Sequence, residues 1–406
     1  MSSIALIFLS FAFAYFLSAL VRAVTATLAP AFSAELGLTS GDLGLLAGAY
    51  FLGFAATQLP LGHALDRWGP RRVLLALLTL AVIGCAAFAM ADRFAALTLA
   101  RALIGAGLSA CLMAPLTAFR RTFSPVAQLR ANSWMLMSGS LGMVASTLPV
   151  QWLLPSLGWR GLFWLVAALL VVAMLAIRLC VPADDTASAP AGKGEGEAGY
   201  AAIVRHPVFL RYAPLAFFHY AGMVAVQTLW AGPWLVRVCG WTPQQAAGGL
   251  FAINVAMLLA FLCWGFVVPR LYRGGWSAAR LVAWGVPVSL AVLVLAIVLG
   301  EGATAWAWAL FCVSCTVISL SQPAVGQAFP SALAGRALSA YNLVIFAGIF
   351  AIQWGLGLAI DAFAVAGAST LSAFRGAMAL LGLCALFAYL WFLWHGRSAD
   401  AKLAGH

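Results

Sequence analysis

The sequence predicts an all-α membrane protein in which twelve transmembrane helices form two pseudo-symmetric six-helix bundles. Three observations lead to this prediction. Of the 406 residues, 64% are hydrophobic and only 8% are charged, with a mean hydropathy of +1.01. Because soluble globular domains are about 25% charged, this composition excludes a water-soluble fold. The apolar residues also gather in long runs, and the basic residues concentrate in every second segment between those runs.

The apolar runs have the length of membrane-spanning helices, which need about 20 residues each. Runs such as VLLALLTLAVIGCAAFAM (73–90) lack the alternating polarity of the strands in a transmembrane barrel. The first run is longer than a signal-peptide core and follows no basic residue, so we expect it to be retained. The expected spans are residues 4–29, 40–62, 71–91, 94–119, 130–153, 160–181, 209–236, 245–268, 279–299, 303–327, 337–361 and 374–395.

The distribution of basic residues predicts the orientation of these spans. If the N-terminus is cytoplasmic, 16 of the 22 Lys and Arg residues fall in cytoplasmic segments and four in outer ones. Such a bias is the positive-inside signal of inner-membrane proteins. It also accounts for the net charge of +11 without a nucleic-acid partner. We therefore expect a multi-pass protein of a bacterial inner membrane with both termini in the cytoplasm.

The chain divides into two halves that resemble each other. A polar stretch rich in Pro, Gly and Ala separates the sixth span from the seventh and predicts a flexible linker. The expected units are a first bundle at 1–181, a linker at 182–207, a second bundle at 208–396 and a cytoplasmic tail at 397–406. GHALDRWGPRR (62–72) and GFVVPRLYRGG (265–275) lie 203 residues apart, as do Pro30 and Pro233. An internal repeat of this kind is typical of transporters with a site between the halves, near the bilayer midplane.

The loop after the second span carries a family resemblance. GHALDRWGPRR (62–72) resembles the loop signature of the major facilitator superfamily, with a Gly, an Asp-Arg pair, a second Gly and two basic residues. RALIGAG (101–107) is similar to a second motif of that superfamily. The resemblance implies a secondary transporter that binds and releases a small solute by alternating access. We therefore do not expect an enzyme.

The same resemblance implies that this loop is a conformational latch on the cytoplasmic side. The Asp is expected to cap the N-terminus of the eleventh span, where the helix dipole favours an anion, and the basic residues to meet lipid phosphates or acidic groups. Contacts that form only when the cytoplasmic side is closed would favour the outward-facing state. The latch residues are Gly62, Asp66, Arg67, Gly69, Arg71, Arg72 and Arg336.

Two arginines lie inside predicted spans, where a permanent charge is costly. Arg22 in the first span and Arg101 in the fourth lie at about the same depth, and no Asp or Glu occupies the middle of any span. In the superfamily these two spans line the central cavity. Since buried charges need partners, the pair predicts an anion-binding site. An arginine binds both oxygens of a carboxylate or phosphate at once.

The sequence around Arg22 indicates whether the expected anion carries one negative charge or two. RAVTATLAP (22–30) is similar to the first span of the organophosphate:phosphate antiporter branch, where an arginine eight residues before a proline binds phosphate. The second arginine of that branch would map to Ala225, so it is absent here. We therefore expect a monoanion such as a carboxylate rather than a phosphate dianion.

Polar residues of the second half complete the expected substrate site. These residues lie on the spans that line the cavity in the superfamily, or on spans next to those. They are His219, Gln227, Trp230, Gln322 and Asn342. His219 can titrate and so take part in proton coupling. His219 and Met223 are also one helical turn apart, which suits a soft metal and leaves copper uptake as an alternative.

The predicted function is transport of a small organic monoanion, with a proton as a possible co-transported ion. The alternatives are efflux of hydrophobic or amphipathic compounds, copper uptake and, from another class, a non-transporting membrane receptor. We expect no catalytic residues, no resident metal and no cofactor. The expected partners are the substrate and membrane lipid, and the expected state is a monomer.

Overall fold

The computed structural model describes residues 3–183 and 196–403, so the centre of the predicted linker lies outside the described residues. All regular elements in these ranges are helices. Those of the first half are α1 (Ser3–Leu36), α2 (Ser40–Ala56), α3 (Gln58–Trp68), α4 (Pro70–Met90), α5 (Phe94–Leu108), α6 (Met113–Thr122), α7 (Pro125–Ala145) and α8 (Leu148–Cys180). The second half contains α9 (Gly196–Arg205), α10 (Pro207–Pro214), η1 (Leu215–Tyr220), α11 (Ala221–Ala225), η2 (Val226–Trp230), α12 (Ala231–Arg237), α13 (Pro243–Arg273), α14 (Ala278–Leu299), η3 (Gly300–Gly302), α15 (Ala305–Cys315), η4 (Thr316–Leu320), α16 (Ser321–Gln327), α17 (Ser331–Val365) and α18 (Thr370–Leu403).

The helices follow the predicted spans closely. In the described residues nine helices are long and apolar enough to cross a membrane, and a tenth crossing is the pair α2 and α3, which is bent by 45°. The two remaining predicted spans correspond to α7 and to the segmented run from α10 to α12. The predicted boundary between the fifth and sixth spans falls at Gly158, whose φ of 62° interrupts the helical backbone of α8. A positive φ is readily adopted only by Gly, so this residue permits the turn.

The seventh predicted span is not a continuous α-helix. Its π-helical segments η1 and η2 alternate with α11 and α12 in a single run. A π turn inserts an extra residue and changes the direction of the side chains that follow it, and such turns are frequent at functional sites. The segment η2 carries Gln227 and Trp230, two of the predicted site residues. The side chains of this span therefore do not follow a simple 3.6-residue period.

Two parts of the predicted polar segments prove to be helical. Residues 196–205, expected to be flexible, form α9, and Ile203 on that helix is fully buried. The α9 helix packs against α17, and burial of Ile203 stabilises this helix within the segment that was expected to be flexible. Similarly, α18 continues to Leu403, into the predicted tail.

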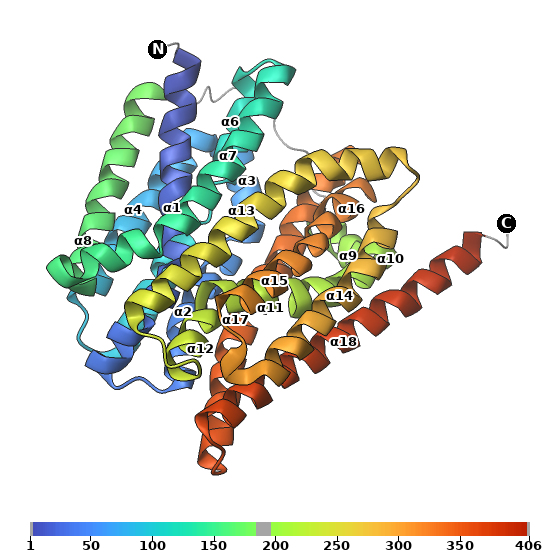
Figure 1. Ribbon diagram of the computed structural model, residues 1–406. Coiled ribbons are helices and arrows are strands. Elements are labelled where there is room, and N and C mark those ends of the chain that lie inside the picture. The colour runs from blue at the N-terminus through green and yellow to red at the C-terminus, as the bar shows by residue number, and fades with distance from the viewer. Residues whose placement is uncertain (1–2, 184–195, 404–406) are drawn as a thin grey trace.

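The two halves lie side by side and contact each other through several helix pairs, which include α7 with α13 (Figure 1). The helix α2 packs along α17, and α1 packs against η2 and α12. We call the side with residues 68–70 and 123–125 the inner face and the side with residues 37–39 and 91–93 the outer face. By the positive-inside prediction the inner face is cytoplasmic.

The outer face is closed by hydrogen bonds between the halves. The carboxylate of Asp361, on α17, accepts hydrogen bonds from the backbone N–H groups of Ser40 (3.0 Å) and Gly41 (2.7 Å) at the start of α2. Arg237, at the end of α12, donates to Oγ of Ser40 (3.0 Å). We call these four residues the outer clasp. An acid at a helix N-terminus satisfies free N–H groups and the helix dipole together, so the outer clasp holds the halves together at this face.

Candidate functional site

A cavity of about 660 Å³ lies between the two halves. Its walls come from α1 and α7 of the first half and from η1, α11, η2, α13, η4 and α16 of the second. A volume of this size is typical of sites that bind small molecules. The wall extends to the exposed side chains of Trp134 and Phe266, on the parts of α7 and α13 that approach the inner face. The cavity is thus reached from the inner half of the molecule, while the outer clasp closes the opposite face.

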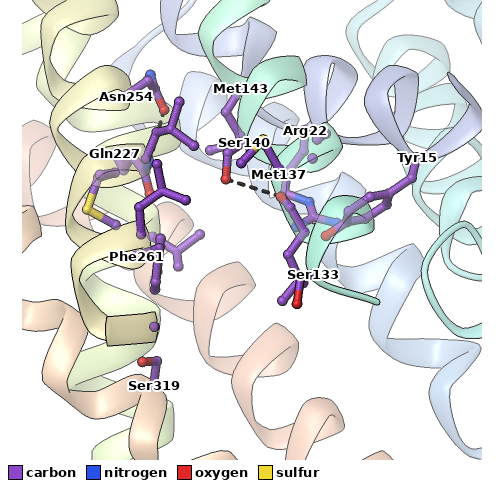
Figure 2. Close-up of a pocket in the computed structure, with 18 of the residues that line it drawn as sticks. Tyr15, Arg22, Ser133, Met137, Ser140, Met143, Gln227, Asn254, Phe261 and Ser319 are labelled. Atoms are coloured by element: carbon purple, nitrogen blue, oxygen red, sulfur yellow. Dashed lines mark hydrogen bonds between the residues drawn. The ribbon is translucent and has the colours of Figure 1, made fainter. Parts of the chain in front are cut away.

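Arg22 is the cationic side chain of this cavity wall. It follows Tyr15 and Ala19 on the same stripe of α1, at intervals of four and three residues, which places all three on one helix face. Figure 2 shows Arg22 beside Tyr15, with Ser140 and Met137 of α7 close by. The close approach of α7 to Tyr15 requires Gly139, because a Cβ at this position would overlap the tyrosine ring.

The charge of Arg22 has no acidic partner in the described part of the chain. Ion pairs there involve Arg160 with Glu35 and Asp92, near the outer face. The guanidinium lies 5.4 Å from the ring centre of Phe54 and 5.9 Å from that of Phe346. Its Nε is buried without a hydrogen-bond partner. Cation–π contacts offset part of the cost of a buried charge, and Tyr50 forms a side-chain hydrogen bond with Arg22, but neither contact neutralises the positive charge. The site can therefore accept an anion.

Arg101 lies at the same level but serves a different contact. Its Nη2 donates to Oγ1 of Thr25 (2.6 Å) and its Nη1 to the carbonyl oxygen of Val21 (3.4 Å), both on α1. The side chain is only 1% exposed and does not line the cavity. The sequence prediction of equal depth agrees with this arrangement, because Arg101 bonds the residue next to Arg22. The expected contact of Arg101 with substrate stays a prediction, and in this structure its guanidinium joins α5 to α1.

The opposite wall carries three side-chain amides. Gln227 of η2 donates from Nε2 to Oδ1 of Asn254 on α13 (2.9 Å), and both residues line the cavity (Figure 2). Gln322 of α16 also lines it and donates from Nε2 to Oδ1 of Asn342 on α17 (2.8 Å). Asn342 itself is not part of the wall. Its contribution is to orient Gln322.

Two other predicted site residues are engaged away from the cavity. Trp230 is fully buried and donates from Nε1 to the carbonyl oxygen of Gln353 (3.2 Å), so it joins η2 to α17. His219 is 2% exposed, and its Nε2 lies 2.8 Å from Oγ of Ser289. Met223 lines the cavity whereas His219 does not. The structure therefore does not bring this His and Met to a common face of the cavity.

The latch residues lie at the inner end of α3 and the start of α4. The helix α3 packs on α17, and Gly62 faces Ser339 of that helix. Asp66 is exposed, and the Arg67 guanidinium lies 5.7 Å from the ring centre of Trp68. Gly69, with a φ of 83°, separates α3 from α4. The cap from Asp66 to the eleventh span, and the roles of Arg72 and Arg336, stay predictions.

One latch contact differs from the expectation. Arg71 donates from Nη2 to the carbonyl oxygen of Arg178 (2.7 Å), near the end of α8. The last carbonyl groups of a helix lack intrahelical donors, and a basic side chain satisfies them. Arg71 therefore joins two helices of the first half, in addition to any contact with lipid.

The outer clasp and the wall formed by Tyr15 and α7 were not among the predicted site residues. Asp361 lies at the outer end of the eleventh expected span, but the fifth span, its counterpart in the internal repeat, ends without an acid, so the repeat gave no signal for it. Likewise, no signal marked Tyr15, Met137 or Met143. Their positions in the cavity wall depend on how α1 and α7 are rotated about their axes.

Comparison with known proteins agrees with this architecture. The sequence profile of the Major Facilitator Superfamily matches residues 11–353. The 3-(3-hydroxy-phenyl)propionate transporter of Escherichia coli (strain K12) is 29% identical over 239 residues, which cover 57% of this chain and 55% of the relative. The chain thus spans about half the length of the curated relative that it matches.

Solved structures extend the similarity to the whole chain. A bacterial homolog of the human lysosomal transporter Spinster, in an inward-facing and unoccupied conformation, has a TM-score of 0.79 at 19% identity and covers 98% of both chains. A D-xylose-proton symporter has a TM-score of 0.76 at 15% identity, over 96% of this chain and 97% of the symporter. At such identities the similarity shows a shared fold.

Proposed function

Because the chain belongs to the major facilitator superfamily and is a multi-pass membrane transporter, we propose that its cargo is a small organic monoanion bound through its carboxylate by Arg22. The observation that carries this proposal is a guanidinium in the cavity wall with no carboxylate partner among the described residues. A carboxylate that receives both arms of the fork supplies the missing hydrogen bonds and the missing charge.

The rest of the cavity wall suits an organic body attached to the carboxylate. Apolar side chains surround the polar groups, including Met137, Met143, Met223, Met257 and Phe261. Methionines adapt their shape and make favourable contacts with aromatic rings. The curated relative is named for an aromatic carboxylate, which carries one negative charge and a ring. This name supports an aromatic or similarly apolar monoanion as cargo here.

The transport cycle that we propose is alternating access in a bacterial inner membrane, with residues 1–181 and 208–396 as the moving halves. In the described conformation the outer clasp is formed and the cavity extends toward the inner face. Opening of the outer face would require these bonds to break. The latch on α3 and α4 would then stabilise the inner face in its closed form. A co-transported proton belongs to the same proposal, as does action as a monomer.

The experiment that tests the cargo compares Arg22→Ala with the wild type in direct binding and in uptake into proteoliposomes. The probe is 3-(3-hydroxyphenyl)propionate. Two charge-assisted hydrogen bonds are worth about 3–6 kcal/mol together, so we expect a loss in affinity of about 100-fold or more. The control is Arg93→Ala, which removes the same side chain from an exposed position at the start of α5. Equal affinity in Arg22→Ala and Arg93→Ala contradicts the proposal.

Efflux of amphipathic compounds is a second candidate, favoured by the apolar side chains of the wall. A neutral amphipathic cargo would use the methionine and phenylalanine contacts and not the charge of Arg22. Its binding would therefore be unchanged in Arg22→Ala, whereas Met137→Ala combined with Met257→Ala would weaken it. The same two variants thus separate the two candidates.

A further inference from the structure

The side-chain amides of Gln227 and Asn254, on the second-half wall, each have one possible orientation of their oxygen and nitrogen atoms. A backbone contact of Asn254 fixes it. Asn254 donates from Nδ2 to the carbonyl oxygen of Leu250, four residues earlier on α13 (2.9 Å). A carbonyl oxygen only accepts hydrogen bonds, so the amide nitrogen of Asn254 must be the atom that faces it. The Oδ1 of Asn254 is then the atom that faces Gln227.

The orientation of Gln227 follows in the same way. Its partner atom, Oδ1 of Asn254, is an acceptor, so Gln227 must present its Nε2 there (2.9 Å). The Oε1 of Gln227 is left as the remaining polar atom of the side chain. It accepts no hydrogen bond from a described residue, and it is not one of the buried polar atoms that lack a partner. This acceptor is therefore open to the cavity that Gln227 lines.

Gln322 repeats the arrangement on the same side of the cavity. Its Nε2 donates to Oδ1 of Asn342 (2.8 Å), so its Oε1 is also directed away from its protein partner. The second-half wall thus offers hydrogen-bond acceptors. The first-half wall offers Arg22, which can only donate. Figure 2 shows Arg22 and Gln227 on opposite sides of the cavity.

We infer that the cargo carries a hydrogen-bond donor, a hydroxyl or N–H group, on the end away from its carboxylate, and that Oε1 of Gln227 selects for this group. The inference rests on the proposed function, because it assumes that the carboxylate occupies Arg22. A site built around a buried acceptor discriminates against an analogue that lacks the donor, since the acceptor then loses its water without gaining a partner.

The placement of a donor on the first half and an acceptor on the second also gives the cargo a role in the transport cycle. A molecule with a carboxylate at Arg22 and a donor at Gln227 bonds both halves at once. A cargo with the carboxylate alone bonds the first half only. Because a ligand shifts a conformational equilibrium by its difference in affinity for the two states, the bifunctional cargo favours the state in which the halves approach each other around the cavity.

The test measures binding of three probe groups to the purified full-length protein. These are 3-phenylpropionate, its three ring-hydroxylated isomers, and the corresponding methoxy compounds, which keep the size and lose the donor. For the wild type we expect the best hydroxylated isomer to bind at least about tenfold more tightly than 3-phenylpropionate and its methoxy analogue. In Gln227→Leu this preference should disappear, because only the affinity for the hydroxylated isomer falls. The ratio of the two affinities should then be about one.

Two controls make the result specific. Retained affinity for 3-phenylpropionate in Gln227→Leu shows that the variant is folded and that the Arg22 site is intact. Gln151→Leu makes the same exchange on α8, outside the cavity wall, and should keep the wild-type preference. An unchanged preference in Gln227→Leu, or no preference in the wild type, overturns the inference while leaving the proposed function in place. If no probe binds, or if binding is insensitive to Arg22→Ala, the proposed function fails and the inference fails with it.

Discussion

Arg22 and Arg101 are two guanidinium groups at one level of the molecule with different surroundings. Arg101 bonds Thr25 and Val21 of α1 and is almost fully buried. Both arginines contact aromatic rings and keep an unpartnered Nε, but Arg22 alone of the two faces the cavity. The pair shows that depth in the membrane and residue type do not define a role. What differs is whether a neighbouring helix supplies acceptors for the guanidinium.

The geometry of α1 explains the difference. Val21 and Thr25 are four residues apart and therefore lie on one face of the helix, the face that meets α5. Arg22 is rotated by about 100° from Val21 and lies on the cavity face with Tyr15 and Ala19. One helix thus presents acceptors to one arginine and directs the other toward the cavity.

The largest effect that we expect from testing the different roles of Arg22 and Arg101 is the loss of stability in Arg101→Ala. The substitution removes two hydrogen bonds and leaves an unfilled volume between α5 and α1, so we expect the free energy of unfolding to fall by about 2–4 kcal/mol. Thermal unfolding in detergent measures this change. Affinity for 3-(3-hydroxyphenyl)propionate should change by less than about threefold, which is within the effect of small shifts in packing. A large loss of affinity with unchanged stability would reverse the assigned roles.

A second expected effect concerns two acids at opposite faces of the molecule, Asp361 in the outer clasp and Asp66 exposed at the inner face. Asp361→Asn removes the charge that two backbone N–H groups share, which is worth about 1.5–3 kcal/mol. Amide hydrogen exchange of a peptide covering residues 38–45 should become about tenfold faster or more, since closure of the outer face is weakened. Asp66→Asn is the matched control and should leave this peptide unchanged. Equal exchange rates in the two variants would show that the outer clasp does not hold the face closed.

The smallest expected effect separates the charge of Arg22 from its shape. Arg22→Lys keeps the positive charge and loses the planar fork that binds both oxygens of a carboxylate. We expect about a tenfold loss of affinity for 3-(3-hydroxyphenyl)propionate, equivalent to about 1.4 kcal/mol. Isothermal titration calorimetry of this variant beside Arg22→Ala measures the two losses. If Arg22→Lys binds as weakly as Arg22→Ala, the fork itself is required and the charge alone contributes little.

The sequence predicted more of the fold than of the site. The long apolar runs located the helices, and the interruption near Gly158 was expected from the break between two runs. The π segments of the seventh span were not foreseen, because a π turn changes the hydrogen-bond pattern without changing the composition. The helix α9 was missed since its stability depends on packing against α17.

The predicted site residues divide according to whether they reach the cavity. Arg22, Gln227 and Gln322 line it, whereas Arg101, Trp230 and His219 do not. All six are polar or amphipathic residues within apolar runs, so nothing local distinguishes the two groups. The partners of the second group lie between 70 and 123 residues away in the chain, as for His219 with Ser289 and Trp230 with Gln353.

The sequence by itself thus determined that this protein is a helical membrane protein, because the free energy of placing a segment in a bilayer depends on the residues of that segment. Its loop motif added the resemblance to a transporter family. The sequence also determined which polar side chains had to find partners within the membrane. Only the tertiary structure decided which of them bond to one another and which stay available to a cargo. Hydrogen bonds require two groups within about 3 Å, and helix rotation and packing bring those groups together from distant parts of the chain.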